Sequence, residues 1–210
     1  MFITFEGPDG SGKTTQARLL AEWLRGQGYE VVLTREPGGT AVGDQIRQVL
    51  HDPRNTALDD RTEILLYSAD RAQHVAQRIR PALANRAIVI SDRYADSTLA
   101  YQGYGRGLDV DVLCTITTFA TGGLQPDLTL YLDIAPEEGL QRRRSSGGEW
   151  NRLDAQALEF HQRVRAGYLE LIKQDPDRWE SVDAARPVEE VQAEIRALVK
   201  AKLEQVKRNA

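Results

Sequence analysis

Short apolar segments alternate along the chain with longer stretches in which apolar residues recur at helical spacing. The short segments predict β-strands over residues 2–6, 29–34, 87–92, 128–133 and, more weakly, 179–182. Most of them are nearly continuous in apolar residues, as is typical of parallel strands that are covered on both faces. The alternation therefore predicts an α/β fold, with a doubly wound parallel sheet of about five strands flanked by helices. In such sheets the ligand lies beyond the carboxyl ends of the strands.

The stretches between the strands have the spacing of amphipathic helices. We predict helices over residues 15–25, 44–50, 60–85, 110–120 and from 188 onward. The pair Asp52-Pro53 separates the second helix from the third. We expect the third helix to bend at Pro81, because proline disrupts a helix interior.

The composition narrows the class of protein. The chain has 210 residues, 41% of them hydrophobic, and a net charge of −4, so we expect one domain over residues 1–210 and no general affinity for nucleic acid. Cys114 is the one cysteine, which excludes an internal disulfide and a cysteine-based zinc site. No basic leader and no apolar run of about 20 residues is present. We therefore expect a cytoplasmic protein without a membrane span.

Residues 7–14 read Gly-Pro-Asp-Gly-Ser-Gly-Lys-Thr, which is the pattern of a nucleoside-triphosphate loop between a strand and a helix. Backbone N–H groups, a helix dipole and the charge of Lys13 would hold the phosphates, and the Thr14 hydroxyl would contact Mg²⁺. A glycine-rich turn without a ligand is the alternative. The residues that we expect to bind ATP or GTP are Gly7, Pro8, Asp9, Gly10, Ser11, Gly12, Lys13, Thr14 and Thr15.

The third predicted strand ends in Ser91-Asp92-Arg93-Tyr94. An apolar run followed by an acid is the arrangement that holds Mg²⁺ beside a phosphate loop, so Asp92 and Thr14 are the candidate metal ligands. Arg93 would then offer a bidentate charge to a second phosphorylated ligand. A local ion pair at the strand end is the alternative for Asp92 and Arg93.

At this point the chain closely resembles the thymidylate kinase family. The resemblance rests on seven segments in order, FEGPDGSGKTT at 5–15, TREPGGT at 34–40, YSADR at 67–71, DRY at 92–94, YQG at 101–103, RG at 106–107 and PDLTLYLD at 126–133. It implies a P-loop NTPase fold of the nucleoside monophosphate kinase type, with a short lid. It also implies phosphorylation of dTMP to dTDP with ATP and Mg²⁺, in the synthesis of dTTP.

The resemblance further assigns residues of the acceptor site. Asp9 falls where the family has a carboxylate near the transferred phosphate, and Arg93 where it binds the dTMP phosphate. The base pocket would consist of Tyr67, which stacks on thymine, Arg71, which bonds its carbonyl, and Thr98 and Gln102 at the base edge. Tyr101 would lie by the sugar, with Glu36 and Arg47 on the sugar and phosphate side. From the residues alone, Tyr67 would be core and Arg71 solvated.

A basic cluster predicts the lid. Arg142-Arg143-Arg144 precedes Ser145-Ser146-Gly147-Gly148, and Arg152 follows, so we expect a lid over about 142–152 whose arginines stabilise the moving phosphoryl group. Gly10 and Ser11 stand where other members of the family carry a loop arginine, so the resemblance implies catalysis by lid arginines, and we assign Arg142, Arg144 and Arg152 to it. A solvated helix end is the alternative.

Two other functions are compatible with a phosphate loop. A deoxynucleoside kinase would need a carboxylate base for a sugar hydroxyl, and a nucleotide-dependent switch would recognise guanine through an Asn-Lys-x-Asp segment that is absent.

The family resemblance implies a homodimer, for which the helix over 110–120 is a candidate contact, although such apolar helices also form cores. The three histidines, His51, His74 and His161, have no ligand spacing, and we assign them no role.

Overall fold

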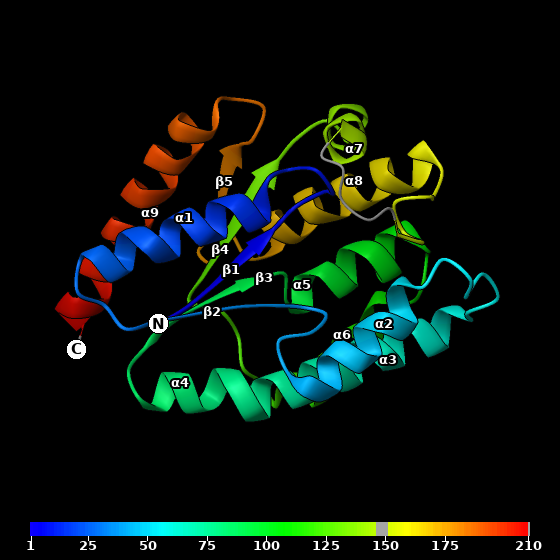
Figure 1. Cartoon of the computed structure of the whole chain (residues 1–210), viewed down its shortest axis with the longest axis horizontal. Coiled ribbons are helices and arrows are strands. Elements are labelled where there is room, and N and C mark those ends of the chain that lie inside the picture. Colours follow the sequence, from blue (N-terminus) through cyan, green and yellow to red (C-terminus); the bar gives the residue numbers. More distant parts are fainter. Residues whose placement is uncertain (146–150, 210) are drawn as a thin grey trace.

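Five strands form one parallel sheet in the computed structural model, which describes residues 1–145 and 151–209 (Figure 1). Their spatial order is β2-β3-β1-β4-β5, and every neighbouring pair is parallel. The predicted doubly wound sheet is therefore confirmed. The strands are β1 Phe2–Glu6, β2 Val31–Arg35, β3 Ile88–Asp92, β4 Leu128–Asp133 and β5 Trp179–Asp183.

Helices follow each strand. They are α1 Lys13–Gly26, α2 Ala41–His51, α3 Asp60–His74, α4 Arg80–Ala84, α5 Ala95–Thr98, α6 Val110–Thr121, α7 Pro136–Ser145, α8 Leu158–Gln174 and α9 Val188–Asn209, with two π-helical segments, η1 Val75–Ile79 and η2 Leu99–Gly105. The sequence patterns missed α5 and η2, which lie directly after β3 and carry several residues of the predicted acceptor site.

A widened helical turn directly precedes Pro81, where the sequence predicts a bend. Between α3 and α4, the backbone N–H of Arg80 donates to the carbonyl of Val75. Proline has no N–H and its ring crowds the carbonyl four residues earlier, and a π-type turn relieves this conflict.

The sheet is covered on both faces (Figure 1). Alternate residues of the central strands, such as Ile3 and Phe5, pack against α1 and α9. Their neighbours on the opposite face pack against α8 and η2 around Tyr131, or against η1 around Phe2 and Val89. The edge strand β2 is less buried than its apolar sequence predicts, because it has a single neighbouring strand.

Two glycines let the phosphate loop touch the helix that carries the basic cluster. A Cβ on Gly10 would lie 1.9 Å from the carbonyl oxygen of Gly139 in α7, and a Cβ on Gly139 would lie 2.4 Å from that of Asp9. Because neither residue has a side chain, α7 packs directly on the loop. Its last turn, with Arg142, Arg143 and Arg144, therefore follows a segment in contact with the loop.

None of the helices in residues 1–145 and 151–209 combines the length and the apolar character that crossing a membrane requires.

Candidate functional site

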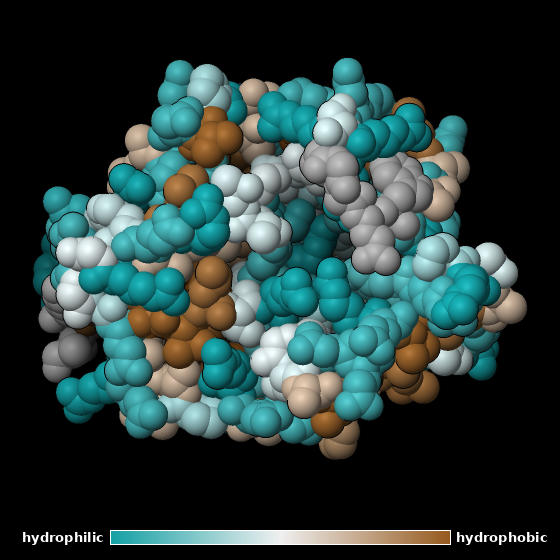
Figure 2. Space-filling model, in the orientation of Figure 1, coloured by the Kyte–Doolittle hydropathy of each residue, from teal (hydrophilic) through white to brown (hydrophobic). Residues whose placement is uncertain are grey.

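A cavity of about 420 Å³ lies at the carboxyl ends of β1, β2 and β3. Figure 2 shows a hollow near the middle of this face of the molecule, with hydrophilic residues at its base. Most of the sequence candidates line the cavity, namely Asp9, Gly10, Gly12, Lys13, Thr14, Thr15, Glu36, Arg47, Tyr67, Arg71, Asp92, Arg93, Thr98, Tyr101, Gln102 and Arg142. The lining does not include Gly7, Pro8, Ser11, Arg144 or Arg152.

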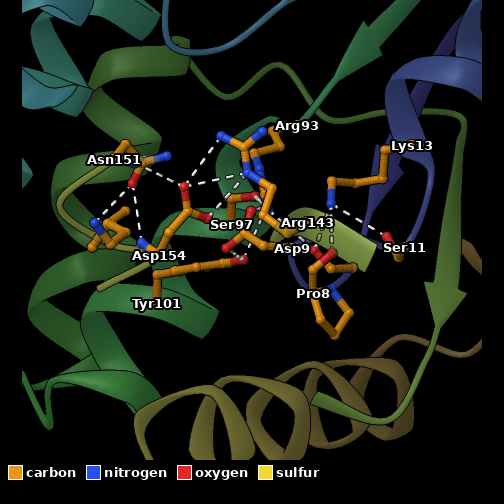
Figure 3. A network of polar contacts seen from close by, with 12 residues as sticks. Pro8, Asp9, Ser11, Lys13, Arg93, Ser97, Tyr101, Arg143, Asn151 and Asp154 are labelled. Carbon is orange, nitrogen blue, oxygen red and sulfur yellow. Dashed lines mark hydrogen bonds and ion pairs between the residues drawn. The ribbon is translucent and has the colours of Figure 1, made fainter. Parts of the chain in front are cut away.

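Lys13 lies folded against the phosphate loop (Figure 3). Its Nζ donates to the carbonyl of Gly7 at 3.0 Å, to that of Pro8 at 2.8 Å and to Oγ of Ser11 at 3.3 Å. Burial, followed by the nearby charge of Arg93, lowers the pKa of Lys13 to about 8. The amine therefore remains mostly charged at neutral pH and lies beside the space that a triphosphate would take.

Thr14 and Asp92 meet across the cavity. The Thr14 hydroxyl donates to Oδ2 of Asp92 at 2.5 Å, although 78 residues separate the two in the sequence. A hydroxyl and a carboxylate are hard oxygen ligands, which suit Mg²⁺ in a site that water and phosphate complete. The pair thus fits the metal role that the sequence predicts.

Asp9 and Arg93 form the charged centre of the site (Figure 3). The Arg93 NH2 group donates to Oδ1 of Asp9 at 2.6 Å and to the Tyr101 hydroxyl at 2.9 Å, and this hydroxyl donates to Oδ2 of Asp9 at 2.8 Å. Burial alone would raise the pKa of Asp9, but the charges of Arg93 and Lys13 outweigh it and lower the pKa well below its usual range. Asp9 is therefore ionised and fixes the arginine and the tyrosine together.

The backbone also fixes Arg93. Its φ is 73°, in the left-handed region that non-glycine residues rarely adopt, and its N–H donates to the carbonyl of Phe5 at 2.9 Å. Such a conformation persists where surrounding contacts determine it, and it is common at functional sites.

Arg71 is held in place by three different acceptors. Its Nε donates to Glu36 at 2.8 Å, NH1 to the Thr98 hydroxyl at 2.9 Å and NH2 to the carbonyl of Tyr94 at 3.0 Å. Glu36 also contacts Nδ1 of His74 at 2.9 Å. Arg71 is 2% exposed, so the structure replaces the solvated arginine expected from the residues alone with a buried one. Arg71 nevertheless lines the cavity.

A buried carboxylate joins the predicted base pocket to the end of the predicted lid. Glu63 of α3 accepts hydrogen bonds from Gln102 at 2.8 Å and from Arg106 at 2.9 and 3.0 Å, and it pairs with Arg152. Burial alone would raise the pKa of Glu63, but these donors outweigh it and lower the pKa. Glu63 thus fixes Gln102 at the cavity wall and ties Arg152 to α3.

The four basic residues of the predicted lid take different positions. Arg142 donates to the carbonyls of Ala184 and Ala185 and pairs with Glu138, while Arg143 pairs with Asp154, and both line the cavity. Arg144 is exposed. The predicted flexible segment, Ser145-Ser146-Gly147-Gly148, lies outside the described residues after its first member.

The sequence patterns gave no role to several residues of this site, namely Glu6, Glu63, Ser97, Arg143, Asn151, Leu153 and Tyr168. For two of these residues the sequence does carry a signal, namely an acidic residue within an apolar segment. Glu6 ends an apolar strand, and Glu63 lies beside Ile64 in a helical stretch. His51, to which no role was assigned, lines the cavity, and burial and Arg47 lower its pKa to about 4. His161 is buried, and its Nε2 has no partner within the described residues.

We expect substitution of the lid arginines to lower kcat with little change in the affinity for the phosphate acceptor, because a lid acts on the group in transfer. Arg142, Arg143, Arg144 and Arg152 would be changed singly to alanine and assayed at steady state, with Arg18→Ala on the exposed face of α1 as the control. At least one of the four should lose kcat. Normal kcat in all four variants would rule out a catalytic role for this cluster.

A family model, relatives and a solved structure that resemble this chain all belong to one enzyme family. The model of the family described as Thymidylate kinase matches residues 5–195. The chain is 54% identical to a thymidylate kinase of Roseiflexus castenholzii, over 95% of this chain and 92% of the relative, and 50% identical to one of Bacillus pumilus, over 93% and 92%. A crystal structure of thymidylate kinase from Ehrlichia chaffeensis superposes with a TM-score of 0.79 at 36% identity, covering 95% of this chain and 98% of that one.

Proposed function

The chain belongs to the thymidylate kinase family and is an enzyme that phosphorylates dTMP to dTDP, and from this premise we propose that ATP is the donor and that the cavity described above is the active site. One observation carries the proposal. Lys13 of the phosphate loop and Arg93 at the end of β3 line the same cavity, with Asp9 close to both. The cavity thus has one cationic group for a triphosphate and another for a monophosphate.

The reaction is a direct transfer between two phosphates. A phosphate oxygen of dTMP attacks the γ-phosphorus of ATP in line, a P–O bond forms to the acceptor, and the bond to the β-phosphate oxygen breaks to release ADP. A phosphate monoester is already an anionic nucleophile, so no general base is required. Lys13 stabilises the charge on the β- and γ-phosphates, and Arg93 orients the acceptor.

Thr14 and Asp92 would hold Mg²⁺, whose charge would offset that of the phosphates when it is bound. Asp9 is ionised beside the anionic substrates. Its negative charge would therefore repel the phosphates if no donor neutralised it. Its contacts with Arg93 and Tyr101 spread that charge over donors. We therefore assign Asp9 to positioning these two donors.

The acceptor base pocket follows from the remaining lining residues. Tyr67 lies half-buried at the cavity and offers a ring face to a pyrimidine. Arg71 offers N–H groups to a base carbonyl, and Thr98 and Gln102 lie at its edge. Tyr101, Glu36 and Arg47 also line the cavity, and we assign them to the sugar and phosphate of the acceptor.

Arg71→Ala should raise KM for dTMP and narrow the preference of the enzyme for dTMP over dCMP. The substitution removes a donor to the base carbonyl and leaves Glu36 with one partner fewer, and an unmatched buried polar group costs roughly 1 to 3 kcal/mol. Steady-state assays with dTMP, dUMP, dCMP and dGMP measure this. An unchanged preference for dTMP would contradict the base role of Arg71.

The donor and the acceptor are tested together by ADP formation. We expect turnover with ATP and dTMP in the presence of Mg²⁺, and none above background with thymidine or without an acceptor. Chelation of the metal should stop turnover. Equal rates with thymidine would instead indicate a deoxynucleoside kinase, and ATP hydrolysis without an acceptor would indicate a nucleotide-dependent switch.

The assembly and location of the enzyme are also part of the proposal. The face formed by α3 and α6 carries exposed apolar residues, with Phe119 88% exposed, Leu65 58% and Val112 53%, and exposed apolar patches of this kind mark interaction surfaces. We propose that the chain forms a homodimer through this face, as one kinase domain over residues 1–210 that works in the cytoplasm on free nucleotides. Sedimentation equilibrium of the purified chain tests the dimer.

A further inference from the structure

Glu6 is a buried carboxylate that the reaction described above does not use. It is the last residue of β1, directly before the phosphate loop, and it is 0% exposed. A buried carboxylate is costly unless it is paired or fully hydrogen-bonded. Its contacts therefore indicate what it does for the fold or for the site.

Within the described part of the chain, the Glu6 carboxylate accepts hydrogen bonds from Tyr94 and Ser97, which closely follow Arg93 in the sequence, and from Tyr168 of α8. Oε1 accepts from the backbone N–H of Tyr94 at 2.8 Å, and Oε2 accepts from the hydroxyls of Ser97 at 2.5 Å and of Tyr168 at 2.8 Å. The same two hydroxyls accept from NH1 of Arg93, at 3.1 Å for Ser97 and 3.3 Å for Tyr168. Both hydroxyls thus lie between the guanidinium and the carboxylate (Figure 3 shows Arg93 and Ser97).

The direction of these bonds is fixed by chemistry. An ionised carboxylate accepts and cannot donate, so both hydroxyls donate to Glu6 and accept from Arg93, and neither hydrogen is then used in the 3.0 Å contact between the two hydroxyl oxygens. A guanidinium donates and cannot accept, so the arrangement suits Arg93 on the other side. If Glu6 carried a proton, that proton would occupy one of these hydrogen bonds, and the hydroxyl that accepts it would turn its own hydrogen to the other hydroxyl, whose oxygen lies 3.0 Å away. The two hydroxyls would then no longer both be held as acceptors toward Arg93.

We propose that Glu6 is a positioning residue for the acceptor phosphate, which it orients through the hydroxyls of Ser97 and Tyr168 and the guanidinium of Arg93. The inference rests on the proposed role of Arg93 as the dTMP phosphate ligand. Under this proposal, the orientation of the Arg93 guanidinium depends on the Glu6 carboxylate, which does not contact the substrate.

The charge environment of Glu6 supports a titration near neutral pH. Burial, and then the charge of Asp96, raise the pKa of Glu6 to about 7, although Arg93 and the bonds from Ser97 and Tyr168 act in the opposite direction. Lys13 of the phosphate loop also lies within electrostatic reach. Because Glu6 is ionised above about pH 7 and neutral below it, dTMP binding should weaken as the pH falls through this value.

Calorimetry with dTMP and with thymidine, without ATP, tests the proposal. At pH 8, Glu6→Gln should weaken dTMP binding by about fivefold to tenfold, as expected for a misdirected buried hydrogen-bond network, and should leave thymidine binding unchanged. Tyr168→Phe removes one of the two hydroxyls, should act in the same direction more weakly, and serves if Glu6→Gln does not fold. Asp127→Asn, which removes a carboxylate that accepts from the Phe2 backbone N–H at the opposite end of β1, is the control.

The pH profile is the second measurement. The dTMP phosphate itself takes up a proton near pH 6, and this effect is common to both proteins. Wild-type binding of dTMP should fall between pH 8 and 6.5 more steeply than that of Glu6→Gln. Identical profiles would overturn the proposal, and so would an equal loss of thymidine binding.

Arg93→Ala separates this inference from the proposed function. If Arg93→Ala weakens dTMP selectively while Glu6→Gln and Tyr168→Phe do not, the inference fails and the proposed phosphate site stands. If Arg93→Ala leaves dTMP binding unchanged, the phosphate site itself is wrong, and the inference fails with it.

Discussion

Lys13→Ala is expected to lower kcat for dTMP phosphorylation by on the order of a hundredfold, with the fold retained. The lysine supplies a preorganised charge beside the β- and γ-phosphates, and loss of one such contact costs about 3 kcal/mol in the transition state. Lys13 is 6% exposed and lies within the loop, so solvent cannot replace its charge. Steady-state turnover with ATP and dTMP measures the loss.

The control for this experiment is Lys173→Ala. Lys173 lies on α8 with its side chain 73% exposed, paired to Glu170, so its removal should change neither turnover nor stability appreciably. Circular dichroism and thermal unfolding of both variants show whether the fold persists. Turnover of Lys13→Ala close to wild type would rule out the catalytic role of the loop.

Arg93→Ala is expected to weaken every nucleoside monophosphate acceptor by a similar factor, on the order of a hundredfold in kcat/KM. Arg93 holds the phosphate, which dTMP, dUMP and dCMP share, and truncation of one partner of a buried charge pair costs roughly 2 to 5 kcal/mol. Part of this loss arises because Asp9 remains without its partner at 2.6 Å. The ratio of dTMP to dCMP activity should stay constant, in contrast to the effect of Arg71→Ala.

Arg93→Lys distinguishes charge from geometry. Lysine keeps the positive charge but lacks the planar fork that donates to Asp9, Tyr101, Ser97 and Tyr168 at once, so it should recover part of the loss. Arg18→Ala, which removes an exposed arginine from α1, is the control for loss of charge alone. A change in base preference with unchanged phosphate affinity would contradict the role of Arg93.

The phosphate loop and the sheet could be predicted because their signals are local. The Gly-Pro-Asp-Gly-Ser-Gly-Lys-Thr loop depends on backbone conformations that its own glycines permit, and each buried strand must be apolar along its own length. Segment identity and the α/β class follow from such patterns. The observed strand bounds still differ from the predicted ones. The strand β2 runs over Val31–Arg35 and not 29–34, because its pairing with β3 decides where it begins.

The family resemblance predicted more of the acceptor site than the pattern of residues alone did. From spacing, Tyr67 was a core residue and Arg71 a solvated one. The structure buries Arg71 because Glu36, Thr98 and the Tyr94 carbonyl reach it from positions 35, 27 and 23 residues away. No pattern within one helix contains that information, since the partners come from other elements.

The sequence by itself determined the five strands and their order along the chain, the phosphate loop and the likeness to one enzyme family, since each of these depends on residues that are neighbours in the sequence. Only the tertiary structure decided the sheet order β2-β3-β1-β4-β5, the π-helical segment that carries Tyr101 and Gln102, and the partners of the buried acids Glu6 and Glu63. Glu6 meets Ser97 across 91 residues and Tyr168 across 162. A carboxylate becomes a positioning group through donors that only packing brings to it, and the sequence around it gives no sign of them.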